Sequence, residues 1–259
     1  MNPRIPVVVG RVTVYKWDDS AQPLKGAVFG IFQGSVKITE MTTGTDGMAT
    51  SDELAEGNYT LREIEAPVGY KITTQDIDFG IHENSIEPRF DVQNTRIAGK
   101  VKIIKTGADK KPLPGVVYGV YEKSTDKKLE ELTTGADGTA TSGTLYYGEY
   151  YVKELKPAAG YESAPAPVPF SIVEHDVTVE IRLTADMIQG SLKIIKIDES
   201  TGLRLKDAVF GLYNDLNQKI AELKTNANGE AIYSGLPAGD YTLKEQQAPE
   251  MYILTDTPD

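Results

Sequence analysis

Three polar side chains in the first third of the chain could react with one another. Lys16 ends the alternating run Val-x-Val-x-Lys, Glu63 ends Tyr-x-Leu-x-Glu, and Asn94 ends Phe-x-Val-x-Asn. Successive side chains of a β-strand point to opposite faces, so each polar residue is predicted to share its strand's buried face with apolar residues. A lone buried charge is costly, which requires partners for Lys16 and Glu63. We expect the three side chains to meet in the core.

Such a trio could form an intramolecular amide bond. Burial lowers the pKa of a lysine and raises that of a glutamic acid, so the pair can exist as a neutral amine and a neutral acid. A neutral amine can attack the Asn94 carboxamide, while protonated Glu63 polarises that group and shuttles protons as ammonia leaves. Contact imposed by the fold supplies a high effective concentration. The alternative is an unreactive buried or half-buried Lys–Glu ion pair, which can be neutral for stability.

The glutamate motif occurs three times, as YTLREIEAPVGY, YYVKELKPAAGY and YTLKEQQAPEMY, with its glutamates 91 residues apart (154 − 63 and 245 − 154). Each copy opens with a strand-like segment that carries a lysine: GRVTVYKWD, GKVKIIKTG and GSLKIIKID. A period of this length is that of a domain and is too long for a solenoid repeat. We predict a lead-in at 1–9 and domains at 10–98, 99–189 and 190–259.

The elements between these motifs are predicted to be strands. Tyr, Thr, Val and Gly are plentiful, turn signals are frequent, and no long stretch has helical periodicity. We interpret Asp46-Gly47, Asp137-Gly138 and Asn228-Gly229 as hairpin turns. Almost no linker separates FDVQN from Gly99, which favours a stiff rod. The fold class is therefore all-β.

Composition excludes several function classes. The net charge of −11 argues against partners such as nucleic acid or anionic membrane, and the absence of cysteine excludes disulfides and thiolate metal sites. The two histidines, His82 and His175, fall in different domains, and the Asp-Gly turns lack a calcium-ligand series. We expect no cofactor and no metal. No signal peptide, long apolar segment for membrane insertion or sorting segment is evident, so we expect a piece of a longer protein.

The second copy differs in chemistry. In register with the first copy, Ala185 occupies the position of Asn94, and alternation points the neighbouring Asp186 to the opposite face. We predict no crosslink there and an unreacted Lys105–Glu154 pair, with a bond through Asp186 left open.

The third copy keeps Lys196 and Glu245, but the sequence ends at Asp259, seven residues after Tyr252. We expect this domain to lack its last strand. Its open edge could accept a β-strand donated by another chain, although simple truncation is the plainer alternative. Met251 also replaces the glycine of the other two motifs.

The strand G-x-V-x-V-x-K, the box Y-x-L-x-E-x-x-A-P-x-G-Y and the strand V-x-N together resemble the CnaB-type, or SpaA-like, pilin domains of Gram-positive surface proteins. The resemblance covers nearly the whole chain. It implies tandem immunoglobulin-like or prealbumin-like Greek-key β-sandwiches. It also implies an isopeptide crosslink between the first-strand Lys16 and the last-strand Asn94, catalysed by Glu63.

The expected function is a structural stalk or pilin-like segment of a secreted protein of the Gram-positive cell wall. Its partners would be other domains of that protein or pilus subunits. The alternative is an adhesin region that binds host matrix protein or glycan, for which Trp17 and the many tyrosines offer a surface unless they serve packing. A turnover enzyme is disfavoured, because no nucleophile, base and orienting group recur outside the single-turnover site.

Overall fold

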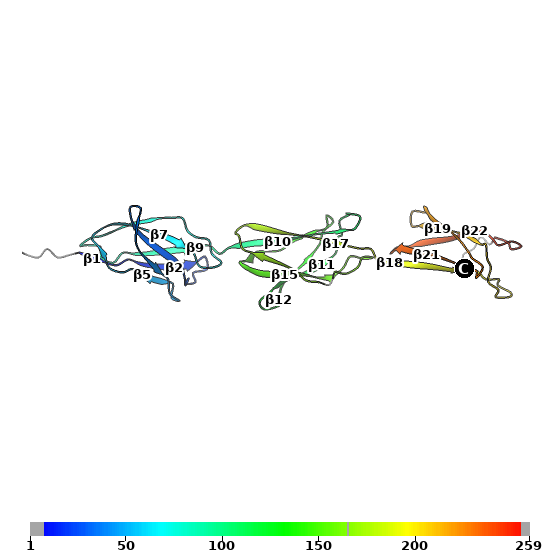
Figure 1. Ribbon diagram of the computed structural model, residues 1–259, viewed down its shortest axis with the longest axis horizontal. Helices are drawn as coiled ribbons and strands as arrows, with labels where there is room; N and C mark the ends of the chain where they lie inside the picture. Colours follow the sequence, from blue (N-terminus) through cyan, green and yellow to red (C-terminus); the bar gives the residue numbers. More distant parts are fainter. Residues whose placement is uncertain (1–7, 165, 255–259) are drawn as a thin grey trace, which may run out of the picture.

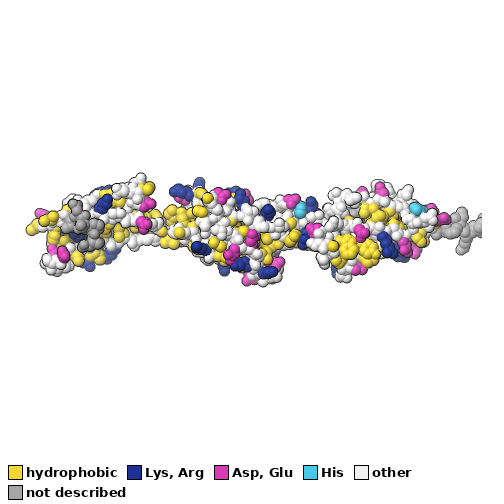
Figure 2. Space-filling view, turned by 180° about the vertical axis from the view of Figure 1, so that it is seen from behind, with side chains coloured by type: hydrophobic (Ala, Val, Ile, Leu, Met, Phe, Trp, Pro, Cys, Tyr) yellow, Lys and Arg dark blue, Asp and Glu magenta, His cyan; other side chains and the backbone are white. Residues whose placement is uncertain are grey.

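A computed structural model describes residues 8–164 and 166–254 and shows three β-domains in an extended row (Figure 1). Residues 1–7 of the expected lead-in and residues 255–259 lie outside this description. Within the described ranges, the regular secondary structure consists of strands alone. Acidic and basic side chains are interspersed along the visible face (Figure 2). The all-β prediction is confirmed.

Domain 1 is a sandwich of two sheets. One sheet has the order β5-β2-β9 and the other β4-β3-β7-β8, while short β1 pairs with β6. The strands are β1 (Val9–Gly10), β2 (Thr13–Asp18), β3 (Val28–Gln33), β4 (Val36–Thr42), β5 (Met48–Thr50), β6 (Leu54–Ala55), β7 (Gly57–Glu65), β8 (Ile77–Ile81) and β9 (Arg89–Asn94). The first long strand, β2, pairs in parallel with the last, β9. Burial alternates along β2 and places Val14, Lys16 and Asp18 between the sheets, while Tyr15 and Trp17 are half-buried on the other face.

Domain 2 repeats this plan. β10 pairs with β13, with β14 and, in parallel, with β17, and the second sheet has the order β12-β11-β15-β16. The strands are β10 (Ala98–Gly107), β11 (Val117–Glu122), β12 (Lys127–Thr133), β13 (Thr139–Thr141), β14 (Leu145–Tyr146), β15 (Gly148–Lys156), β16 (Val168–Ile172) and β17 (Val177–Ala185). The parallel register aligns Gly107 with Ala185, as Asp18 is aligned with Asn94 in domain 1.

Domain 3 has a two-stranded sheet, β18-β21, and a three-stranded sheet, β20-β19-β22. The strands are β18 (Gln189–Ile195), β19 (Val209–Asn214), β20 (Lys219–Lys224), β21 (Glu230–Pro237) and β22 (Tyr241–Gln247). Up to residue 254, the described part of this domain contains no counterpart of β8 or β9.

The interpretation of the Asp-Gly turns as hairpins is wrong. The turn at Gly47 has positive φ, as expected, but it joins β4 to β5, which belong to different sheets. The turn folds back onto the lysine strand: Lys16 N donates to Gly47 O at 2.7 Å, and a Cβ at position 47 would lie 2.5 Å from Lys16 O. Glycine is needed here both for the left-handed backbone and for the close approach. Gly138 and Gly229 hold the other two lysine strands in the same way.

The joints between domains repeat one hydrogen-bond pattern. At the first joint, Ile97 N donates to Gly69 O at 2.8 Å and Tyr147 N donates to Ile97 O at 2.9 Å. At the second, Ile188 N donates to Gly160 O and Ala238 N donates to Ile188 O. At each joint, one isoleucine therefore donates a backbone hydrogen bond to the preceding domain and accepts one from the following domain.

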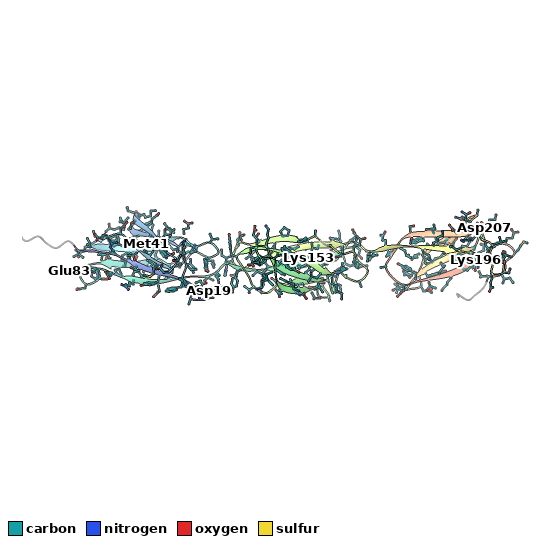
Figure 3. All side chains as sticks on the ribbon, turned by 90° about the horizontal axis from the view of Figure 1, so that it is seen from below. Asp19, Met41, Glu83, Lys153, Lys196 and Asp207 are labelled. Atoms are coloured by element: carbon teal, nitrogen blue, oxygen red, sulfur yellow. The ribbon has the colours of Figure 1, made fainter. Side chains whose placement is uncertain are left out.

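The first joint has an additional side-chain clamp. The guanidinium of Arg96 lies 4.2 Å from the centroid of the Tyr146 ring in domain 2, and its Nε donates to Asp19 at 2.7 Å. Asp19 lies at the end of domain 1 nearest domain 2 (Figure 3). Met187 occupies the position of Arg96 in the second joint and cannot form this clamp.

Candidate functional site: three lysine–glutamate centres

The fold of domain 1 brings together the three residues that the sequence singled out. Lys16 lies on β2 and Asn94 at the end of β9, so their parallel pairing makes them neighbours in one sheet. Glu63 lies on β7 and projects from the facing sheet. All three are buried, with exposed fractions of 0% for Lys16, 3% for Glu63 and 2% for Asn94. The centre therefore spans the interior of the sandwich.

Hydrogen bonds connect these side chains into a closed set. Lys16 Nζ donates to Asn94 Oδ1 at 2.5 Å and lies 3.1 Å from Glu63 Oε1. Asn94 Nδ2 donates to the same Glu63 oxygen at 2.8 Å. The other oxygen, Oε2, accepts the backbone N–H of Thr73 at 2.7 Å. One carboxylate oxygen is thus shared by the amine nitrogen and the amide nitrogen.

The surroundings favour the neutral amine. Burial lowers the pKa of Lys16, and the charge and hydrogen bonding of Glu63 oppose this shift without cancelling it. The Phe29 ring lies against the site, with its centroid 5.4 Å from Lys16 Nζ. A lysine held this way beside a carboxamide and a carboxyl group has the parts needed for amide exchange: a nucleophile, an electrophile and a proton carrier.

Domain 2 keeps the lysine and the glutamate but surrounds them differently. Lys105 Nζ donates to Glu154 Oε2 at 2.9 Å, and the buried Tyr118 hydroxyl donates to the same oxygen at 3.1 Å. Burial and the nearby carboxylate of Glu154 raise the pKa of Tyr118 and keep it protonated. Ala185 is buried at the register position of Asn94, whereas Asp186 is exposed. The structure therefore places no amide or carboxyl group of residues 185–186 beside Lys105.

In domain 3 the same pair lies partly open to solvent. Lys196 Nζ donates to Glu245 Oε2 at 2.9 Å, and the side chains are 25% and 8% exposed, compared with 1% and 0% for the pair in domain 2. Within the described residues, Glu245 Oε1 is buried without a hydrogen-bond partner. Position 255, the counterpart of the Ala164 amide that binds Glu154 in domain 2, lies outside those residues.

Sequence reasoning missed two groups that complete these centres. The first is the backbone N–H that binds the second glutamate oxygen, from Thr73 in domain 1 and Ala164 in domain 2. No side-chain pattern marks it. The second is the aromatic residue on the neighbouring strand, for which alignment of FGIF, YGVY and FGLY carried a usable signal: only the second copy has tyrosine at its first position.

The two histidines lie apart from each other and from the lysine–glutamate centres. The described ranges hold no group of three or more His, Asp or Glu side chains suited to a metal ion. His82 lies at an isolated bridge with Ser85, and His175 accepts the backbone N–H of Ala98. Across 8–164 and 166–254, no helix has the length and apolar character required to cross a membrane.

Comparison with known proteins places the chain in a family. The solved structure of the Bacillus anthracis TIE protein is similar, with a TM-score of 0.86 and 28% identity over 96% of this chain and 47% of that chain. The trypsin-resistant surface T6 protein of Streptococcus pyogenes is 28% identical over 143 residues, which are 49% of this chain and 26% of T6. The collagen adhesin of Staphylococcus aureus is 39% identical over 73 residues, covering 26% of this chain and 6% of the adhesin.

The chain thus spans only a small part of either curated relative. The family model described as SpaA, a prealbumin-like fold domain, matches residues 10–96, 99–186 and 190–258. Because these three matches in tandem span most of its length, the chain belongs to the SpaA family of prealbumin-like fold domains.

Proposed function

We propose that this chain is a stalk segment of a Gram-positive cell-surface protein, and that domain 1 is locked by an autocatalytic Lys16–Asn94 isopeptide bond. The observation that carries the proposal is the position of Glu63 Oε1, which lies 3.1 Å from the amine nitrogen and 2.8 Å from the amide nitrogen. A single oxygen at this place can take a proton from one nitrogen and give it to the other. The family membership and the surface T6 relative support the cellular setting.

The reaction would proceed in one turnover. Neutral Lys16 Nζ attacks Asn94 Cγ and forms a C–N bond, while protonated Glu63 polarises the carboxamide. Glu63 gives its proton to Asn94 Nδ2, the Cγ–Nδ2 bond breaks, and ammonia leaves. Glu63 then takes the proton that the lysine nitrogen loses. Glu63 is regenerated, and nothing is oxidised or reduced.

The bond would serve a mechanical purpose. It joins β2 to β9, the first long strand and the last strand of domain 1, as a disulfide would in a protein that had cysteines. Such a tie restricts the unfolded chain and resists proteolysis and unfolding under force. A row of domains with short, hydrogen-bonded joints suits the same purpose (Figure 1).

Intact mass tests the crosslink. We expect the purified chain to weigh less than its sequence by one ammonia, and a joined peptide containing Lys16 and Asn94 after digestion. Glu63→Ala should have the full mass calculated from its own sequence. The control Glu65→Ala should still weigh one ammonia less than its sequence. A wild-type mass equal to that of the sequence would overturn the crosslink.

An adhesin role is the second candidate, and two observations favour it. One is the similarity to the collagen adhesin. The other is an aromatic pair found on domain 1: the rings of Tyr15 and Trp17 stack with centroids 6.3 Å apart, and Trp17 Nε1 donates to Asp91. Binding of the chain to collagen or a glycan array, abolished by Trp17→Ala, would support this role. Absence of binding would remove it and leave the stalk proposal standing.

A further inference from the structure

The crosslinking centre of domain 2 has changed at two positions, not one. We propose that the Tyr118 hydroxyl has taken over the hydrogen-bonding place of the Asn94 amide, so that domain 2 holds an inactive crosslinking site that two substitutions would restore. This inference rests on the function proposed for domain 1. It concerns which residues decide whether a domain of this chain reacts.

The backbone of the two centres is equivalent. Glu154 pairs with Tyr118 across β15 and β11 as Glu63 pairs with Phe29 across β7 and β3. Ala185 is also in the register of Asn94 on the parallel strand. The differences between the centres therefore lie in side chains and not in strand placement.

The two centres differ in the group that donates the second hydrogen bond to the glutamate oxygen. In domain 1, the glutamate oxygen facing the lysine accepts a second hydrogen bond from Asn94 Nδ2 at 2.8 Å. In domain 2, the corresponding oxygen accepts its second hydrogen bond from the Tyr118 hydroxyl at 3.1 Å. A buried carboxylate needs such donors to offset desolvation. Tyr118 supplies one without supplying a carbon that the amine could attack.

The third copy supports the pairing of these two changes. Its residue at this position is Phe210, which pairs with Glu245 as Phe29 pairs with Glu63. Tyrosine therefore occurs in the one copy whose described last strand carries alanine in place of asparagine. We infer that Tyr118 compensates Glu154 for the lost amide and also competes with any amide returned to position 185.

The restored reaction balances without any further reagent. Ala185→Asn would introduce a carboxamide beside Lys105, and the amine would form a C–N bond to its carbon. The bond to the carboxamide nitrogen would break, and Glu154 would carry the lysine proton to the departing ammonia. Tyr118→Phe would remove the competing hydroxyl donor and recreate the aromatic environment of domain 1.

The experiment uses the full chain in three forms: Ala185→Asn, Ala185→Asn with Tyr118→Phe, and that double variant with Glu154→Gln. Intact mass counts the ammonias lost, and peptide mapping assigns each bond to a domain. The double variant should lose two ammonias, one in each of domains 1 and 2. The single variant should form the bond in domain 2 about tenfold more slowly than the double variant, because one hydrogen bond from Tyr118 competes with the new amide. The triple variant should lose one ammonia, in domain 1.

Two results would overturn the inference. One is a folded double variant, with wild-type hydrogen exchange in domain 2, that crosslinks domain 1 alone. The other is a single variant that crosslinks domain 2 as fast as the double variant, which would deny Tyr118 its role. Absence of the bond in domain 1 itself would instead refute the proposed function, and the mapped peptides separate these cases.

A mirror substitution keeps the test informative should the double variant not fold. Phe29→Tyr introduces the hydroxyl into domain 1, where Asn94 is present. It should slow bond formation in domain 1 by about tenfold and so raise the fraction of chain without a crosslink in freshly made protein, since the hydroxyl competes for Glu63. An unchanged fraction in a folded chain would contradict the competition between the two donors.

Discussion

Lys16 Nζ lies 2.5 Å from Asn94 Oδ1, although 78 positions separate the two residues in the chain. The contact exists because β2 and β9 come early and late in the sequence of domain 1 but are parallel neighbours in one sheet. A bond at this point would close almost the whole domain into a covalent loop. Its effect on stability can therefore be predicted from loop closure.

Asn94→Ala should destabilise domain 1 by about 4 kcal/mol, because the unfolded chain regains the freedom that the closed loop removes. Trp17 is the only tryptophan of the chain and lies on β2, so its fluorescence reports the unfolding of domain 1. The exposed neighbour Thr95 provides a control, and Thr95→Ala should leave the midpoint unchanged. A loss below about 1 kcal/mol for Asn94→Ala would show that no covalent loop exists.

Replacing the lysine should have unequal effects in domains 2 and 3. Lys105→Met leaves the buried Glu154 carboxylate without its ion-pair partner and should cost about 3–5 kcal/mol of unfolding free energy. Lys196→Met should cost about 1 kcal/mol, because water reaches that pair and screens it. Hydrogen exchange resolved by domain measures both effects. Equal losses would contradict the difference in burial.

The stability of domain 1 should depend on pH through Asp18. Burial alone would raise the pKa of Asp18, but hydrogen bonds from Gln22 N, Ser20 N and the Tyr70 hydroxyl outweigh it and lower that pKa. A lowered folded-state pKa gives stability that is present above the unfolded pKa and is lost as pH falls through the folded value.

Asp18→Asn should therefore lower the free energy of unfolding by about 1 kcal/mol at neutral pH. The difference in stability from wild type should vanish once the pH falls below the folded-state pKa of Asp18. Trp17 fluorescence during denaturant unfolding at several pH values provides the measurement. Asp46→Asn, on an exposed turn of the same domain, is the matched control. A difference independent of pH would show that the Asp18 charge has no part in stability.

The first joint should be stiffer than the second. Arg96→Ala removes the contact with the Tyr146 ring and the ion pair with Asp19, and should widen the distribution of distances between spin labels placed on domains 1 and 2. Met187→Ala, its counterpart at the second joint, should leave the distances between domains 2 and 3 nearly unchanged. Similar broadening at both joints would contradict a clamp by Arg96.

The sequence predicted the frame of the centre well because strand periodicity is local. Alternation of apolar residues placed Lys16, Glu63 and Asn94 on buried faces, and the same register marked Ala185 as the replacement for the asparagine. It predicted the turns at Gly47 and its counterparts but assigned them to hairpins. Positive φ is a local property, whereas the sheet that each flanking strand joins depends on the whole domain.

What the sequence determined by itself was three all-β domains, each with a lysine and a glutamate facing its core, because periods of two and of 91 residues are written in residue order. Only the tertiary structure decided which donors complete each centre. The Thr73 amide, the Tyr118 hydroxyl and the joint between Arg96 and Tyr146 all bring together groups from separate segments. Their contacts follow from packing between strands and between domains, and no spacing along the chain encodes that packing.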